Sequence, residues 1–429
     1  MRLRGSLLLL LLYGVLPLAQ AWVYVALQPF ADGFDTANFT ASIVAYHWLL
    51  ANVILGLKLP VFQNDLPYDV RIRLHIWSTL GLIGFLAWHA VYTIFLKVKL
   101  IDAVSWSLLG LFGGLLLLSI LWIPIPGLKA LRRKLVSLLR FGFLKSYDAL
   151  KAGHKILFLV LAALTYVHIV QAQILALVPS VSALGYQLLF LSAAALFVGT
   201  RIHNLTLPTL EVRSVVDEGG IVRLALSSHP RLRYRAGQFA FLRFPLPELA
   251  GEEHPFSFTT ARHEQGVWFA VRALGDFTKK LSQLKPGDRV RVNGGFGAFY
   301  PTSGHEPLAL IGSGIGAAPL VSILKEIGAR EPDREVVCLL SVNRREELVE
   351  AEALRRLSDS MPNLKLRTFA FEEDGRFYGA ELFRQELGDA GRYRYFLCSS
   401  DRVRSIVLDA LKSLGVVRRK IHFEAFNLG

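Results

Sequence analysis

Two apolar stretches that carry histidines at the same spacing constrain the fold of this chain most. His75 and His89 lie in one stretch, His154 and His168 lie in the other, and each pair is fourteen residues apart. Fourteen residues are nearly four turns of α-helix, so both rings of a pair face one side, roughly 21 Å apart along the axis at about 1.5 Å per residue. The hydrocarbon core of a bilayer is about 30 Å thick, so two such helices side by side predict one His–His pair near each membrane surface.

Histidines in lipid are costly and are by default candidates for a functional site. A histidine on each side of one iron ion is the axial ligation of a haem. His75 with His154, and His89 with His168, therefore predict two b-type haems. Each histidine could instead only hydrogen-bond a neighbouring helix, but the duplicated spacing favours ligation by all four. A packing role is expected for His47, which has no counterpart at this spacing.

Charge and hydropathy divide the chain into two halves. Residues 1–203 contain 16 Lys and Arg, 6 Asp and no Glu, whereas residues 204–429 contain 32 basic and 28 acidic residues. The first half therefore predicts an integral membrane domain and the second a soluble module. The basic excess lies beside apolar stretches, which fits the positive-inside rule and argues against a nucleic-acid partner. Cys338 and Cys398 lie in the soluble half and indicate no disulfide framework.

We expect six membrane spans in a domain of residues 1–205, at about 5–27, 39–57, 72–96, 104–123, 152–178 and 182–202. The first stretch also resembles a signal peptide ending at Ala21, but the apolar run continues to Leu27 and favours a retained helix. The basic stretch 129–145 predicts an amphipathic helix at the cytoplasmic surface. A multi-pass membrane protein is therefore expected, with the soluble half in the cytoplasm. His75 and His154 then form the inner pair.

The soluble half contains two regions that differ in their predicted secondary structure. Residues 206–304 contain short alternating strands with Gly and Pro turns, such as Val222–Leu226 and Gln238–Phe244, which predict a small antiparallel barrel. From residue 305 to 429 the order is strand, glycine-rich turn, helix and strand, with the last strand at Val336–Val342. This order predicts a βαβ unit and a parallel sheet.

Three loops in this half have residues suited to a dinucleotide. One is the turn Gly312-Ser-Gly314-Ile315-Gly316-Ala-Ala-Pro319, where glycines allow close backbone approach to a pyrophosphate before a helix N-terminus. Alone it could be an ordinary tight turn. The others offer hydroxyls, backbone groups and cations that suit a flavin and its diphosphate: they are His254-Pro255-Phe256-Ser257-Phe258-Thr259-Thr260 and Gly275-Asp-Phe-Thr278-Lys-Lys.

These motifs, taken in order, resemble a known superfamily. The second half resembles the ferredoxin–NADP reductase family, the first half the ferric-reductase transmembrane family, and the whole chain the NADPH oxidase and ferric reductase superfamily. The resemblance implies FAD at 254–260 and at Gly275 and Thr278, and a nicotinamide nucleotide at 312–319. It also implies roles in the reaction for Cys398, by the nicotinamide, and for Phe426, as the aromatic that covers the flavin. Two departures are the segment Gly294-Gly-Phe-Gly297, which has Gly where the family often has Pro, and Ser399-Ser400 in place of Gly-Pro after Cys398.

Arg344 and Arg345 follow the second strand of the βαβ unit, where a 2′-phosphate would lie. Arginine binds phosphate with two parallel hydrogen bonds, so NADPH is favoured over NADH as electron donor. The alternative is a solvated run of charges beside Glu346 and Glu347.

The resemblance implies a transmembrane oxidoreductase that moves electrons from NAD(P)H through FAD and two haems to an external acceptor. Oxygen, giving superoxide, is the favoured acceptor. The alternatives are ferric or cupric ions, or an external partner protein served by an electron-relay subunit.

Overall fold

The computed structural model describes residues 3–27, 33–66, 68–96, 103–122, 147–174, 180–218, 220–246, 249, 253–273, 276–375 and 377–424. Three sequence predictions, on Gly275, Phe426 and the basic stretch 129–145, therefore lie outside the described residues. The chain divides into two compact units, the first of residues 1–62 and 71–202 and the second of residues 63–70 and 203–428. The two are described separately below.

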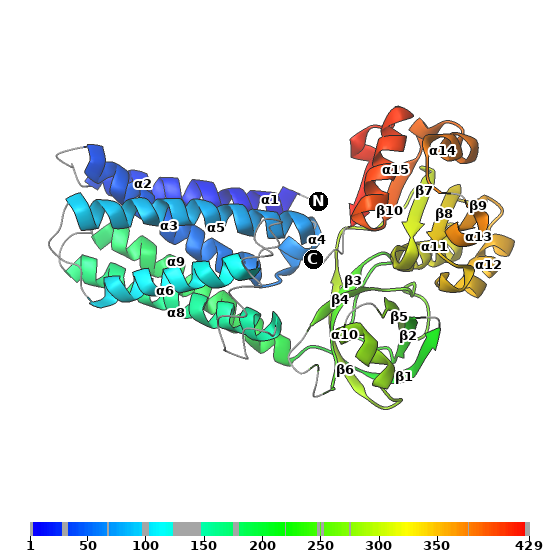
Figure 1. Cartoon of the computed structure of the whole chain (residues 1–429), viewed down its shortest axis with the longest axis horizontal. Helices are drawn as coiled ribbons and strands as arrows, with labels where there is room; N and C mark the ends of the chain where they lie inside the picture. The colour runs from blue at the N-terminus through cyan, green and yellow to red at the C-terminus, as the bar shows by residue number, and fades with distance from the viewer. Residues whose placement is uncertain are drawn as a thin grey trace. The chain divides into compact units, whose positions relative to one another are not determined.

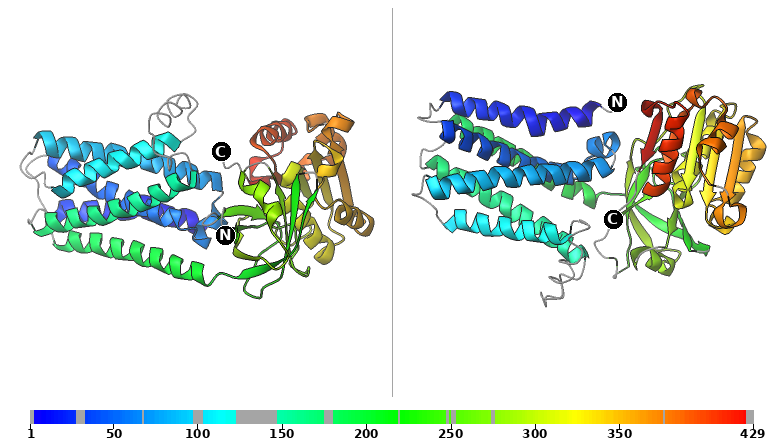
Figure 2. Two further views of the ribbon diagram at one scale, coloured as in Figure 1. Left: turned by 60° about the horizontal axis from the view of Figure 1, so that its bottom comes forward. Right: turned by 45° about the horizontal axis from the view of Figure 1, so that its top comes forward.

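Long apolar helices make up the first unit (Figures 1 and 2). They are α1 (Leu3–Leu10), α2 (Leu16–Leu27), α3 (Gly33–Gly56), α5 (Tyr68–Val91), α6 (Ala103–Trp122), α8 (Tyr147–Ile174) and α9 (Ser180–Leu205). Single π-helical turns follow α1 at Leu11–Val15 and α5 at Tyr92–Leu96. The short helix α4 (Pro60–Asp65) lies in the expected loop between the second and third spans. Proline suits the first position of such a helix, because its missing N–H would be unpaired there anyway.

Five stretches are long and apolar enough to cross a membrane: Arg4–Leu27, Gly33–Gly56, Val70–Ile94, Gly153–Gln171 and Ala183–Leu205. A shorter apolar stretch, Ala103–Leu115 in α6, stands where the fourth of six spans is expected. This count covers the described residues. The length and composition of these helices are those of membrane spans.

Helix α3 is the central helix of this unit. Within the apolar stretches, 67% of α3 is buried, against 11% to 17% of the other four. Gly81 of α5 lies against Trp48 of α3, and a Cβ at Gly81 would meet the indole ring. The glycine therefore lets α3 and α5 approach closely.

The second unit begins with a six-stranded antiparallel sheet in the order β4-β3-β6-β1-β2-β5 (Figure 1). Its strands are β1 (Thr209–Glu218), β2 (Ile221–Leu226), β3 (Phe239–Arg243), β4 (His254–Ser257), β5 (Val267–Arg272) and β6 (Arg289–Phe296). A bridge between Phe258 and Phe269 brings the ends of the two edge strands together. Alternate side chains from these strands form one buried core, as the alternating pattern of the sequence predicts.

A five-stranded parallel sheet follows, in the order β11-β10-β7-β8-β9. Its strands are β7 (Leu308–Ser313), β8 (Val336–Val342), β9 (Leu364–Ala370), β10 (Arg394–Cys398) and β11 (Ile421–Glu424). Helices α11 (Ala317–Arg330) and α12 (Ala351–Ser360) share a core with one face, and α14 (Ala380–Leu387) and α15 (Asp401–Ser413) share a core with the other. The predicted parallel βαβ unit of β7, α11 and β8 is confirmed.

Candidate functional site

The four spaced histidines meet in two pairs. The ring centres of His75 and His154 are 6.3 Å apart, and those of His89 and His168 are also 6.3 Å apart. The ring planes cross at 75° in the first pair and 78° in the second. A metal–imidazole bond is about 2 Å long and the ring centre lies roughly 1 Å behind the nitrogen, so two rings across one ion have centres about 6 Å apart. The separation in both pairs therefore fits one metal ion held between two imidazoles.

The hydrogen bonds of these rings engage the nitrogen Nδ1. Nδ1 of His75 lies 3.1 Å from Asn52 Oδ1, and Nδ1 of His89 lies 3.1 Å from Asn38 Oδ1. Nδ1 of His168 lies 3.4 Å from Ser105 Oγ. A ring that donates from Nδ1 presents the lone pair of Nε2, so the donor set fits bis-histidine ligation of haem iron.

His47 differs from these four histidines. Its Nδ1 lies 2.9 Å from the carbonyl oxygen of Ile43, one turn earlier in α3, and the residue is buried. The ring is thus engaged by its own helix, which agrees with a packing role.

Loops at the carboxyl ends of β7 and β10 face each other in the second unit. The chain runs outward from β7 through β8 to β9, and then returns to place β10 on the other side of β7. Ligands of open α/β sheets bind in the crevice at such a change of direction. The turn Gly312–Gly316 and Cys398 lie at this point.

This turn requires glycines because neighbouring atoms leave no room for a Cβ at two positions and the backbone is left-handed at a third. A Cβ at Gly316 would lie 2.1 Å from the carbonyl oxygen of Cys398, and a Cβ at Gly312 would lie 2.7 Å from Leu320. Gly314 has a φ of +55°, a left-handed conformation that favours glycine. Ile315 of the turn packs against the hydrophobic core, and Pro319 is buried in the first turn of α11, into which the glycine turn leads. Exposed backbone N–H groups at a helix N-terminus suit a pyrophosphate.

The side chain of Cys398 is fully enclosed at this crevice, and burial raises the pKa of its thiol. The thiol therefore stays protonated at neutral pH. It can serve as a neutral wall of a nicotinamide site, whereas a thiolate nucleophile is not expected.

The predicted flavin motif, residues 254–260, consists of strand β4 and the three residues after it. Phe256 and Phe258 pack into the core of the antiparallel sheet, and Phe258 stacks on Tyr234 with ring centres 3.9 Å apart. Alternation along the strand directs Pro255 and Ser257 to the opposite face. His254 packs on Phe277, one residue before Thr278, with ring centres 3.8 Å apart, so two of the predicted flavin loops are neighbours.

Thr259 and Thr260 differ in what they can offer a ligand. Thr260 Oγ1 accepts a hydrogen bond from Tyr234, and its carbonyl accepts one from Ser322 Oγ. Thr259 Oγ1 is buried and has no hydrogen-bond partner among the described residues. A buried hydroxyl without a partner is costly, so Thr259 is the residue of this motif whose chemistry best fits a bound polar cofactor.

Gln238, at the predicted strand entry, fixes the turn beside this motif. Its amide donates to the carbonyl of Gly297 at 2.9 Å and accepts from the backbone N–H of Arg235 at 2.8 Å. A Cβ at Gly297 would lie 2.4 Å from the carboxylate of Glu424, at the end of β11. Strand β11 therefore ends next to the turn at Gly297.

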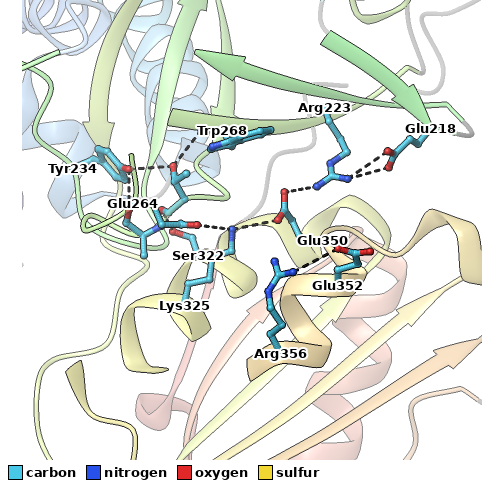
Figure 3. Close-up of polar contacts among 12 residues, drawn as sticks. Glu218, Arg223, Tyr234, Glu264, Trp268, Ser322, Lys325, Glu350, Glu352 and Arg356 are labelled. Atoms are coloured by element: carbon cyan, nitrogen blue, oxygen red, sulfur yellow. Dashed lines mark hydrogen bonds and ion pairs between the residues drawn. The ribbon is translucent and has the colours of Figure 1, made fainter. Parts of the chain in front are cut away.

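A chain of ion pairs joins the antiparallel sheet to the parallel-sheet part (Figure 3). Arg223 of β2 lies 3.0 Å from Glu350, which lies 3.3 Å from Lys325 of α11, which in turn lies 3.2 Å from Glu264. Glu350 occupies a left-handed conformation with φ of +57°, uncommon for a residue with a side chain. Sequence patterns did not predict this row of ion pairs, because its residues are up to 127 positions apart. It helps to fix the two parts, and so the two predicted binding sites, relative to one another.

Arg344 and Arg345 lie at the carboxyl end of β8 but differ in their partners. Arg345 donates from Nε to Glu373 at 2.9 Å and from Nη2 to Asp374 at 3.1 Å. The pKa of Glu373 lies below its ordinary value because Arg345 donates to it. Arg344 has one looser contact, 4.0 Å to Glu347, and its side chain is 56% exposed. Of the two predicted phosphate ligands, Arg344 is therefore the more available.

Comparison with known proteins supports the assignment of the second half. Residues 205–288, which contain β1 to β5, match a family of FAD-binding domains. Dual oxidase 2 of Rattus norvegicus is 26% identical over 310 residues, which cover 64% of this chain and 20% of that protein. The probable electron transfer subunit of dihydroorotate dehydrogenase B from Methanocaldococcus jannaschii is 29% identical over 147 residues, 34% of this chain and 52% of that subunit. This chain thus spans about half the length of one relative and a fifth of the other.

Among solved structures, the Amycolatopsis cytochrome P450 reductase GcoB is 25% identical, with a TM-score of 0.46. The match covers 51% of this chain and 70% of that one.

Proposed function

Because the chain belongs to the superfamily of NADPH oxidases and ferredoxin–NADP reductase-type flavoproteins, we propose that it is a transmembrane NAD(P)H oxidoreductase. In this proposal residues 1–205 hold two bis-histidine haems, residues 206–304 hold FAD, and residues 305–429 bind NAD(P)H. The observation that carries the proposal is the pair of histidine pairs, each with ring centres 6.3 Å apart, in apolar helices. Histidine pairs in membrane helices are otherwise costly.

The bound cofactors would supply the redox chemistry: a flavin accepts a hydride and releases single electrons, and haem iron carries single electrons. The protein binds and positions them. His75 and His154 would hold one iron and His89 and His168 the other, which would leave neither iron an open position for a substrate. The external acceptor would then be reduced without binding to iron, and the site needs no acid–base residue.

The glycine turn would bind the pyrophosphate of NAD(P)H and place the nicotinamide against Cys398. The basic loops of the first half favour a cytoplasmic location for this module, by the positive-inside rule. The bacterial inner membrane is the proposed location, with Phe426 the proposed aromatic cover of the flavin. Oxygen, giving superoxide, is the proposed acceptor.

The acceptor is tested by NADPH-driven reduction of cytochrome c by detergent-purified protein supplied with FAD. We expect superoxide dismutase to abolish the signal, because superoxide would then be the carrier between protein and cytochrome c. If dismutase leaves the rate unchanged, the oxidase proposal is wrong and reduction of ferric or cupric ions or of a partner protein takes its place. The same assay with ferric chelate separates those two.

Nucleotide selectivity tests the role of the paired arginines. We expect Arg344→Ala to raise the KM for NADPH about ten- to a hundredfold, the value of a hydrogen bond to a charged group, and to leave the KM for NADH unchanged. Arg345→Ala is the matched control and should change the KM for NADPH much less, because Glu373 and Asp374 already engage its guanidinium. Equal effects of the two substitutions would show that Arg345 exchanges its carboxylates for the phosphate.

A further inference from the structure

Helix α3 carries two buried asparagines at the spacing of the histidines. Asn38 and Asn52 are fourteen residues apart, as are His75 and His89 of α5. Each asparagine is 4% exposed in a helix that is otherwise largely apolar. A buried amide is costly unless its polar atoms have hydrogen-bond partners. Two buried asparagines at this spacing therefore indicate specific partners on a neighbouring helix.

The partners of these amides are the histidines of α5. Asn38 meets His89 and Asn52 meets His75, each with 3.1 Å between Oδ1 and Nδ1. The pairing runs in opposite directions along the two helices, so α3 and α5 are antiparallel and the equal spacings bring both pairs into register. The close approach at Gly81, between the two levels, lets short asparagine side chains reach across.

Neighbouring hydroxyls hold each amide–imidazole pair in one arrangement. Asn52 Oδ1 also accepts from Tyr13 at 3.0 Å and from Ser78 at 2.9 Å. With Oδ1 as the common acceptor, the hydrogen of His75 must lie on Nδ1, which leaves the lone pair of Nε2 for a metal.

The other level uses a serine in addition to its asparagine. Ser42 donates its hydroxyl hydrogen to the carbonyl of Asn38 at 2.8 Å, so Ser42 Oγ is left to accept from Nδ1 of His89, also at 2.8 Å. Both levels therefore favour the same tautomer of the α5 histidine.

We propose that Asn38 and Asn52 are positioning residues for the two haem ligands of α5, one for each haem. This inference rests on the proposed bis-histidine haems. An acceptor at Nδ1–H fixes the tautomer and the ring orientation and makes the imidazole a stronger electron donor. A stronger donor stabilises ferric over ferrous iron, so each asparagine lowers the reduction potential of its own haem.

The test is spectroelectrochemical titration of the purified full-length protein, in which the potentials of both haems are read from their absorbance. Asn52→Leu removes the acceptor at similar volume and should shift one haem to a more positive potential. Asn38→Leu should shift the other haem in the same direction but by less, because Ser42 Oγ remains 2.8 Å from Nδ1 of His89 as a second acceptor. Ser107→Ala is the control, since Ser107 Oγ bonds only the carbonyl of Ala103 among the described contacts, and it should shift neither.

Unmoved potentials in both leucine variants, or equal shifts of both haems by either variant, would overturn the inference. If a leucine variant does not fold, Asn52→Asp retains an acceptor, and its stronger carboxylate should move the same haem to a more negative potential. An unchanged potential in that variant also counts against the inference. These outcomes differ from failure of the proposed function, in which the unsubstituted protein would bind no haem at all.

Discussion

A His89→Ala protein is expected to contain about half the haem of the unsubstituted protein and to transfer no electrons from NAD(P)H to an external acceptor. The imidazole faces His168 with ring centres 6.3 Å apart, and without it His168 is the one histidine left at that level among the described residues. The methyl side chain of alanine cannot bind iron. Haem absorbance per protein and the rate of acceptor reduction measure the two effects.

His47→Ala is the matched control for this substitution. His47 is also a buried histidine of an apolar helix, but its Nδ1 bonds the backbone of its own helix. It should retain both haems and most of the activity. Normal haem content and activity in His89→Ala would contradict the proposed function, whereas equal losses in His47→Ala would indicate general damage to the helices.

The second large effect is expected for Gly316→Ala, which should raise the KM for NAD(P)H roughly a hundredfold, as displacements of about 1 Å do in binding sites. The new Cβ would lie 2.1 Å from the carbonyl oxygen of Cys398, so the turn and the end of β10 must move apart. Both elements line the crevice proposed for the nucleotide. Steady-state kinetics with NADH and NADPH provide the measurement.

Gly379→Ala is the control, because a Cβ there meets nothing within 4 Å and the residue has extended backbone. FAD and haem contents should be normal in both variants, and dithionite should still reduce the haems of Gly316→Ala. A KM unchanged by Gly316→Ala would remove the glycine turn from the proposed nucleotide site. Loss of bound FAD would instead indicate that the substitution disturbs the whole second unit.

Local patterns were sufficient for most elements of the fold. The strand Val336–Val342 is found at its predicted residues, and a helix, Ala317–Arg330, follows the glycine turn as predicted. Apolar runs and glycine turns are short-range signals, since each depends on residues that are close in the sequence. The second span was less accurate: helix α3 begins at Gly33, six residues before the predicted start, because its first turns contain Asp35 and Asn38 and are not apolar.

The flavin motif shows where a pattern stops being informative. The sequence predicts one ligand-binding segment at residues 254–260. In the structure, however, Phe258 stacks on Tyr234 and Thr260 accepts a hydrogen bond from Tyr234, so both side chains lie in the protein interior. Thr259 is left with a buried hydroxyl that has no partner among the described residues. Which alternate residues of a strand face a ligand depends on the sheet around it.

The sequence by itself determined most of the apolar helices, the histidine spacing and the glycine turn before α11, because helical periodicity and turn chemistry are encoded in neighbouring residues. Tertiary structure alone decided which side chains meet. Asn38 and Asn52 have the same fourteen-residue spacing in the sequence, but their contacts with the histidines depend on α3 lying antiparallel to α5. Likewise, Arg345 is engaged by carboxylates 28 and 29 residues away, whereas Arg344 has only a 4.0 Å contact with Glu347 and is the more available of the two. Contacts between distant residues follow from how whole elements pack, and no local pattern records them.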